Sequence, residues 1–178
     1  RGELANDAVV ATVMSNLGLE LALESIGVDL LRTQVGDRYV VEAMREGGYN
    51  LGGEQSGHIL FLEHSTTGDG MMSALQVLAL MARSGKPLSE LNQGFERLPQ
   101  VTVNIGVAEK RPIEELSSFQ DAVATVEDEL GETGRVLIRY SGTENKARVM
   151  VEGRDEARVH EIANDLAGKL KNALAAGD

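Results

Sequence analysis

The sequence of 178 residues contains no cysteine and no tryptophan, and few aromatic residues of any kind. The lack of cysteine excludes disulfides, cysteine-ligated zinc, iron–sulfur clusters and a cysteine nucleophile. Aromatic residues make up 3% of the chain, which is too little for the stacking platforms that bind single-stranded nucleic acid. Positive charge is also scarce, because 17 Lys and Arg stand against 28 Asp and Glu and leave a net charge of −11. This balance argues against a general affinity for nucleic-acid phosphates.

Long apolar runs are missing as well. The longest covers residues 71–82, which is 12 residues, and includes Ser73 and Gln76, so it is too short to span a bilayer. Residues 1–7 have no apolar core and do not form a signal peptide. The first residue is Arg1 and not Met, so we expect either that a segment has been removed or that the chain is a piece of a longer one. We therefore expect a cytoplasmic protein that binds neither membranes nor nucleic acid.

Strand and helix patterns alternate over residues 1–98, which predicts an α/β domain with a parallel or mixed sheet. Asn16 and Asp69 are of the residue types that cap helices. The helix that ends near Arg83 is apolar on nearly every side, and we expect it to be deeply buried. The expected strands are residues 8–13, 29–33, 49–51 and 59–63. The expected helices are residues 17–26, residues 37–46 and a long helix that starts at Thr67 or Asp69 and ends near Arg83.

Residues 99–178 have a different pattern, in the order strand, helix, strand, strand, helix. This order predicts a smaller α+β domain with its helices on one face of a sheet. Asp155 can cap the last helix, whose apolar residues recur at helical spacing. The expected strands are residues 101–107, 134–139 and 147–152, and the expected helices are residues 119–130 and the segment after Asp155.

The first loop that could carry chemistry is residues 52–58, Gly-Gly-Glu-Gln-Ser-Gly-His. Its glycines allow the backbone to approach a ligand closely. Glu54, Ser56 and His58 alternate, so in an extended segment they point to one side. A carboxylate, a hydroxyl and an imidazole that converge in this way suit a polyhydroxylated ligand. The alternative is a hairpin turn whose polar side chains only face water.

The second loop is residues 139–148, Arg-Tyr-Ser-Gly-Thr-Glu-Asn-Lys-Ala-Arg. Ser141, Gly142 and Thr143 predict a tight turn whose N–H groups and hydroxyls can hold an anion. Arg139 and Arg148 flank this turn and can add charge-assisted contacts to a phosphate. The alternative is a hairpin in which Glu144 neutralises the arginines.

Two shorter motifs have simpler explanations. In Gly36-Asp37-Arg38 we favour Asp37 as the N-cap of the following helix. In residues 66–70, Thr-Thr-Gly-Asp-Gly, capping of the next helix accounts for most of the pattern, and a ligand role is the weaker alternative. No group of carboxylates has a spacing typical of a divalent metal site.

Together, the two loops resemble the sugar-binding and phosphate-binding loops of the α-D-phosphohexomutase superfamily. Residues 13–18 (VMSNLG), 32–39 (RTQVGDRY) and 66–70 (TTGDG) most resemble the branch that acts on glucosamine phosphates. The resemblance covers nearly the whole chain but only the last two domains of a four-domain enzyme. It implies that residues 1–98 are an α/β sugar-binding domain with a mixed sheet. Residues 99–178 would be a smaller α+β phosphate-binding domain with helices on one face of an antiparallel sheet.

The resemblance also implies a reaction for the full-length enzyme. A phosphoserine in the first domain gives its phosphoryl group to the sugar phosphate, and the resulting 1,6-bisphosphate turns around and returns its other phosphate. The net reaction interconverts glucosamine 6-phosphate and glucosamine 1-phosphate for cell-wall precursor synthesis. Mg²⁺ held by the second domain assists. The implied partners are a small phosphosugar and the missing N-terminal domains, and the resemblance leaves a homodimer of the full-length enzyme open.

Carried over residue by residue, the resemblance assigns roles to both loops. Glu54 and Ser56 would bind sugar hydroxyls, with Gly57 and Arg38 in the same site. His58 would position the reacting end of the sugar or transfer a proton there. The residues that would bind the distal phosphate are Arg139, Ser141, Gly142, Thr143 and Arg148.

Some features of the superfamily are absent from this sequence. It contains neither a Ser-His-Asn-Pro nucleophile motif nor an Asp-Gly-Asp-Gly-Asp metal loop, so we expect the chain alone to be inactive. Tyr140 stands where many relatives have proline, and Asn145 also departs from the pattern. Two alternatives remain at this point: a phosphomannomutase or phosphoglucomutase fragment, and a stand-alone phosphosugar-binding module without catalysis.

Overall fold

The computed structural model describes residues 3–92 and 94–176, and Arg1 lies outside the described residues. Its contacts divide the chain into two compact units, residues 1–96 and residues 97–178. No helix in the described part of the chain is both long and apolar enough to cross a membrane.

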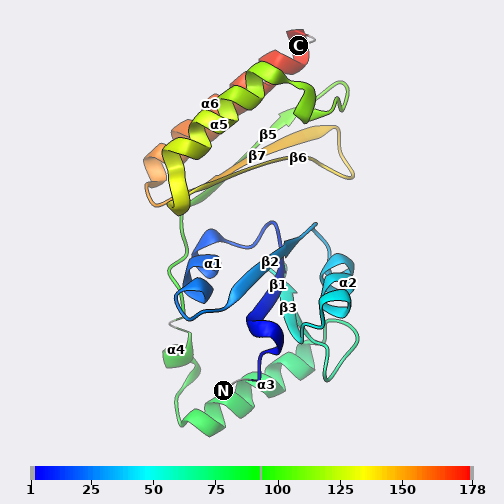
Figure 1. Cartoon of the computed structure of the whole chain (residues 1–178), viewed down its shortest axis with the longest axis vertical. Helices are drawn as coiled ribbons and strands as arrows, with labels where there is room; N and C mark the ends of the chain where they lie inside the picture. The colour runs from blue at the N-terminus through cyan, green and yellow to red at the C-terminus, as the bar shows by residue number, and fades with distance from the viewer. Residues whose placement is uncertain (1–2, 93, 177–178) are drawn as a thin grey trace. The chain divides into compact units, whose positions relative to one another are not determined.

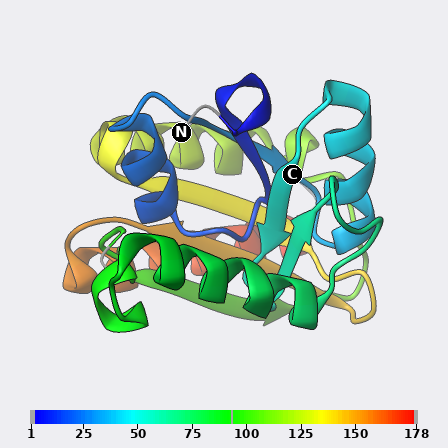
Figure 2. The same cartoon turned by 90° about the horizontal axis from the view of Figure 1, so that it is seen from below.

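The first unit is built on a four-stranded mixed sheet in the order β2-β1-β3-β4. β1 runs parallel to β2 and β3, whereas β3 and β4 form an antiparallel hairpin. Helices α1 and α2 lie on opposite sides of the sheet (Figures 1 and 2). The strands of this sheet and the helices that connect them are β1 (Ala8–Thr12), α1 (Leu17–Glu24), β2 (Asp29–Thr33), α2 (Asp37–Gly47), β3 (Leu51–Glu54) and β4 (His58–Phe61). The 3₁₀ turn η1 (Ala5–Asp7) precedes them.

Apolar side chains of the sheet and of α2 form the core of this unit. Val10, Val40, Met44 and Leu60 are fully buried and pack together. Gly52 lies among them, because a Cβ atom there would come within 2.5 Å of the Met44 sulfur and 2.8 Å of the Val10 carbonyl oxygen. Glycine at this position therefore lets α2 pack closely on β3.

The start of α1 is the one predicted from the sequence, since the Asn16 side chain accepts a hydrogen bond from the Gly18 N–H. The start of α2 differs from the prediction. Asp37 is the first residue of the helix, and Gly36, with a φ of 132°, is the N-cap. The Asp37 carboxylate still lies in the first turn, where the helix dipole favours negative charge.

Helix α3 (Gly70–Ser84) begins as expected but is not buried. The Asp69 carboxylate accepts hydrogen bonds from the Met71 and Met72 N–H groups. No residue of α3 is buried, although we predicted a deeply buried helix. It contacts β4 and the short helix α4 (Leu88–Leu91) within this unit, so only one of its sides is covered. The sequence pattern correctly indicates an apolar helix, but not which surfaces cover it.

The second unit has a three-stranded antiparallel sheet in the order β5-β7-β6. Helices α5 and α6 cover one face of this sheet. The elements are β5 (Gln100–Gly106), α5 (Ser117–Leu130), β6 (Arg135–Tyr140), β7 (Lys146–Glu152) and α6 (Glu156–Ala176), with 3₁₀ turns η2 (Ile113–Glu115) and η3 (Gly131–Thr133). The expectation of a mixed-sheet α/β domain followed by a smaller antiparallel α+β domain is confirmed.

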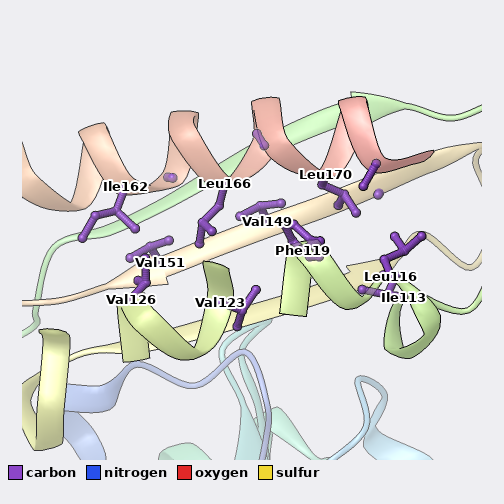
Figure 3. Packing of buried hydrophobic residues seen from close by; sticks show 14 of the residues in the cluster. Ile113, Leu116, Phe119, Val123, Val126, Val149, Val151, Ile162, Leu166 and Leu170 are labelled. Atoms are coloured by element: carbon purple, nitrogen blue, oxygen red, sulfur yellow. The ribbon is translucent and has the colours of Figure 1, made fainter. Parts of the chain in front are cut away.

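The core of the second unit lies between its sheet and its two helices. Phe119 of α5 and Leu166 and Leu170 of α6 point toward Val149 of the central strand (Figure 3). All four are at most 1% exposed. The Asp155 side chain accepts a hydrogen bond from the Arg158 N–H at the start of α6, which confirms the predicted cap.

The opposite face of this sheet carries polar residues. Because neighbouring residues of a strand point to opposite faces, the core position of Val149 directs Arg148 away from the helices. Arg139 of β6 and Asn104 of β5 are the register partners of Arg148. Three polar side chains thus stand in one row across the sheet, at the end nearest the β6–β7 turn.

Candidate functional site

The first loop is the β3–β4 hairpin. Glu54 and His58 are cross-strand partners, and Ser56 and Gly57 lie in the turn between them. Gly57 has a φ of 99°, a left-handed conformation that favours glycine. Residues 52–54, which we expected in a loop after a strand at 49–51, belong to β3 itself. The hairpin, rather than an extended segment, brings the three polar side chains together.

The side chains of Glu54, Ser56 and His58 form one hydrogen-bonded cluster. The Ser56 hydroxyl donates to Glu54 Oε1 at 2.7 Å. His58 Nδ1 lies 2.9 Å from Ser56 Oγ and 3.0 Å from Glu54 Oε1. The Ser56 hydrogen bond is the main reason why the pKa of Glu54 is lowered, and His58 and the Gly36 backbone lower it further against the opposing effect of burial. Glu54 is therefore an ionised acceptor at neutral pH.

Two other predicted segments lie beside this cluster. The Gly36 backbone is close enough to hydrogen-bond Glu54, so the start of α2 adjoins the first loop. A Cβ on Gly68 would contact the His58 ring at 3.5 Å, which places the segment of residues 66–70 next to His58. Arg38 is not drawn into the cluster: its guanidinium stacks on the Tyr39 ring at 4.6 Å and donates to the Tyr39 hydroxyl.

The second loop is the β6–β7 hairpin. The Ser141 N–H donates to the Lys146 carbonyl at 2.8 Å, and the Ser141 hydroxyl accepts from the Glu144 N–H at 3.3 Å. Ser141 is 3% exposed, so its N–H group closes the turn and does not face a ligand. Within the described residues, the turn donors without a hydrogen-bond partner include the Gly142 and Thr143 N–H groups and the Thr143 hydroxyl.

Arg139 and Arg148 lie directly opposite each other on β6 and β7. Burial, and to a lesser degree the positive charge of Arg148, lower the pKa of Arg139. No carboxylate is recorded as a partner of Arg139 in the part of the chain described. Arg148 reaches Glu144 Oε2 only at 3.5 Å, and its buried Nε has no hydrogen-bond partner there. The Glu144 carboxylate pairs mainly with Lys146, so it leaves most of the arginine charge uncompensated.

Two further residues support the second loop. Lys110 donates from Nζ to the Ser141 carbonyl oxygen at 2.6 Å. The Tyr140 hydroxyl donates to the Arg111 carbonyl oxygen at 2.6 Å, so the tyrosine that departs from the superfamily pattern anchors residues 110 and 111. A surface hollow of about 380 Å³ lies between this segment and Arg139. Sequence reasoning missed Lys110, because 31 residues separate it from Ser141 and no local pattern links them.

Comparison with known proteins identifies the family. The family model "Phosphoglucomutase/phosphomannomutase, alpha/beta/alpha domain III" matches residues 1–98. The model "Phosphoglucomutase/phosphomannomutase, C-terminal domain" matches residues 103–169. The chain therefore belongs to the phosphoglucomutase/phosphomannomutase family, and the resemblance to phosphohexomutases seen in its loops is confirmed.

Curated relatives with high identity are named phosphoglucosamine mutase, which is an isomerase. The relative from Anaeromyxobacter dehalogenans is 58% identical over 174 residues, which are 98% of this chain and 38% of the relative. The relative from Myxococcus xanthus is 55% identical over 175 residues, again 98% of this chain and 38% of the relative. The chain thus spans about two fifths of the length of the curated relatives that it matches.

Solved structures share the fold. N-acetylphosphoglucosamine mutase of Aspergillus fumigatus superposes with a TM-score of 0.77 at 22% identity, over 93% of this chain and 38% of that one. A phosphoglucomutase/phosphomannomutase family protein of Burkholderia thailandensis gives a TM-score of 0.69 at 24% identity, over 93% of this chain and 37% of that one. Other structures of the Aspergillus protein are complexes with glucose 1,6-bisphosphate, or with GlcNAc-6P and magnesium.

Proposed function

We propose that this chain is the sugar- and phosphate-binding part of a longer phosphoglucosamine mutase, which interconverts glucosamine 6-phosphate and glucosamine 1-phosphate. In this proposal residues 1–98 bind the sugar and residues 99–178 bind the phosphate that is not reacting. The names of the most similar curated relatives support the substrate. The observation that carries the proposal is the arginine pair of the second loop.

Two arginines directly opposite each other in an antiparallel sheet repel, because like charges at such positions destabilise the strand pair. Arg139 is partly desolvated beside Arg148. Among residues 3–92 and 94–176, the only carboxylate that contacts the pair is Glu144, at 3.5 Å from Arg148. A phosphate dianion relieves both effects. Guanidinium groups bind phosphate through two parallel hydrogen bonds. The unpartnered Nε of Arg148 is a suitable donor for one of them.

The backbone of the same turn adds neutral donors. The N–H groups of Gly142 and Thr143 and the Thr143 hydroxyl follow Ser141, whose position is fixed by its own bonds to Lys146 and Lys110. Successive N–H groups in a turn form a concave anion site. Ser141 and Lys110 therefore position the turn, while Arg139, Arg148 and the free donors contact phosphate. Such a site recognises the charge and shape of a phosphate group and not the identity of the sugar. This suits a mutase that must hold its sugar in both orientations.

The first loop supplies the groups for the sugar. Glu54 is ionised and partly held by Ser56 and His58, so its carboxylate can accept hydrogen bonds from sugar hydroxyls. His58 is more exposed than Glu54, at 53% against 11% of the side chain, and presents its outer ring edge to a ligand. In the proposed complex His58 orients the reacting end of the sugar or carries a proton there. Gly57 allows the turn to approach the sugar closely.

The reacting groups of the family are not encoded in this chain. The sequence contains no Ser-His-Asn-Pro motif and no Asp-Gly-Asp-Gly-Asp loop. Among the described residues, no three His, Asp or Glu side chains gather where a metal ion could bind. We therefore place the phosphoserine and the Mg²⁺ of the family in the missing part of the longer enzyme and assign no step through the metal to this chain.

A chimera tests this function. In it, the chain replaces the matching segment of the Anaeromyxobacter dehalogenans relative, and turnover is measured with glucosamine 6-phosphate, glucose 6-phosphate and mannose 6-phosphate. We expect turnover of glucosamine 6-phosphate in the chimera and none in the 178-residue chain alone. Arg139→Gln with Arg148→Gln should lower kcat/KM by at least about 10-fold, because each charge-assisted hydrogen bond contributes about 1.5–3 kcal/mol.

The control is Arg154→Gln, which makes the same type of substitution once, at an exposed position beyond the far end of β7. It should leave kcat/KM unchanged. An unchanged kcat/KM in the double variant would refute the phosphate site. A preference for mannose 6-phosphate or glucose 6-phosphate would refute the proposed substrate, and turnover by the chain alone would refute the division of roles.

A further inference from the structure

An exposed apolar stripe runs along helix α3. Met71, Leu75 and Leu78 follow one another at intervals of four and three residues, so they lie on the same side of the helix. Their exposed fractions are 77%, 55% and 56%. Ala74 and Ala82 are exposed on the same side. We call these five residues the α3 stripe.

The α3 stripe differs from the single exposed leucines that every protein surface carries. No charged residue occurs between residues 70 and 82, so nothing interrupts the stripe over more than three helical turns. On the other side of α3, which packs toward β4, Met72 and Gln76 are only partly exposed, whereas Leu80 one turn further on is 50% exposed. Contiguous exposed apolar patches of this kind mark interaction sites.

The beginning of the described chain lies next to α3. Glu3 and Leu4 line a surface hollow of about 230 Å³ together with Phe61 of β4 and Gln76 of α3. The first described residues therefore lie beside α3, on the side of the helix that faces β4. The curated relatives extend well beyond the matched segment, and the family model that matches residues 1–98 describes the third domain.

We propose that the α3 stripe is the docking surface for the preceding domain of the longer chain. The inference rests on the proposed function only in taking this chain as part of a longer enzyme. A covalently linked domain has an effective concentration in the millimolar range, so it can be held by a weaker contact than two separate chains need. A second copy of the chain has no such advantage and needs a larger interface to form a stable dimer.

Thiol labelling tests the proposal directly, because the chain has no cysteine. Leu78→Cys places one thiol in the centre of the stripe, at a position where a smaller side chain leaves folding intact. The rate of modification by a thiol reagent is measured by peptide mass spectrometry in the 178-residue chain and in the chimera with the Anaeromyxobacter dehalogenans relative. We expect labelling to be at least 10-fold slower in the chimera.

Ile26→Cys is the matched control, since Ile26 is 71% exposed and lies outside the stripe. It should label at the same rate in both proteins. Equal rates for Leu78→Cys would overturn the proposal. Slow labelling of Leu78→Cys in the 178-residue chain would also overturn it. If that labelling rate rises on dilution, a second copy of the chain covers the stripe. If the rate does not depend on concentration, another part of the same chain covers it. Labelling needs no sugar, so its outcome is independent of the arginine variants.

Discussion

Arg139→Gln separates the binding role of the arginine pair from its effect on folding. Arg139 lies opposite Arg148, and burial and that neighbouring charge lower its pKa. Like charges at opposed positions of a strand pair destabilise it by about 0.2–1 kcal/mol. The substitution breaks no recorded ion pair among the described residues. We therefore expect the free energy of unfolding in phosphate-free buffer to stay the same or to rise by up to about 1 kcal/mol.

Phosphate should reverse the order of stability. A ligand that binds only the folded state at 100 times its Kd stabilises the protein by about 2.7 kcal/mol. Loss of one charge-assisted hydrogen bond, which contributes about 1.5–3 kcal/mol, raises the Kd about 10- to 100-fold. At the same phosphate concentration, the stabilisation of Arg139→Gln then falls to between about 1.4 and 0.4 kcal/mol.

Amide hydrogen exchange of β7, with and without phosphate, measures both quantities in the second unit alone. Arg154→Gln serves as the control, and should gain as much stability from phosphate as the unmodified chain. The reasoning is refuted if Arg139→Gln loses more than about 1 kcal/mol without phosphate, because Arg139 would then be a structural residue. An undiminished gain from phosphate would refute it equally.

Three further predictions concern stability. The pKa of Glu54 lies below the ordinary glutamate value of 4.5, so its stabilising contribution is present above that pH and is lost as the pH falls through the lowered pKa. The stability difference between the unmodified chain and Glu54→Gln, measured by urea unfolding, should therefore shrink below about pH 4.5. Glu152 is fully buried and paired with Arg135, so Glu152→Ala should cost about 3–5 kcal/mol, whereas loss of the exposed Glu156 should change stability by less than about 0.5 kcal/mol. Leu166→Ala should cost about 2–5 kcal/mol because Leu166 is fully buried, and an equal loss for Leu75→Ala in the 178-residue chain would contradict the exposure of the α3 stripe.

The second unit was largely predictable because each of its elements has a local signal. The apolar residues of α6 recur at helical spacing, and Asp155 marks its start. Ala147, Val149 and Val151 occupy every second position of β7 and form its apolar face toward the helices, as the period of a strand requires. Such signals depend on residues a few positions apart, and local preference and tertiary packing agree here.

The features that the sequence did not predict depend on contacts between distant segments. Gly52 and Gly53 suggested a loop, but both pair with neighbouring strands as part of β3. Gly52 is a glycine because Met44 and Val10 leave no room for a Cβ. The phosphate-binding role predicted for Ser141 stays a prediction, and the sequence did not indicate that its N–H closes the hairpin and that Lys110 holds its carbonyl. In both cases the local residues that matter were identified from the sequence. The contacts that explain them come from residues elsewhere in the chain.

Two features of this chain contradict the rules that a self-sufficient domain obeys. The arginines of the second loop stand opposite each other with little compensating charge, and the α3 stripe exposes large apolar side chains along a whole helix. Such violations are expected where a protein interacts with something outside itself. The first is resolved by an anion and the second by an apolar surface, so the two sites need different occupants. Phosphate should therefore stabilise the second unit without changing thiol labelling of Leu78→Cys, and attachment of the preceding domain should slow that labelling whether or not phosphate is present.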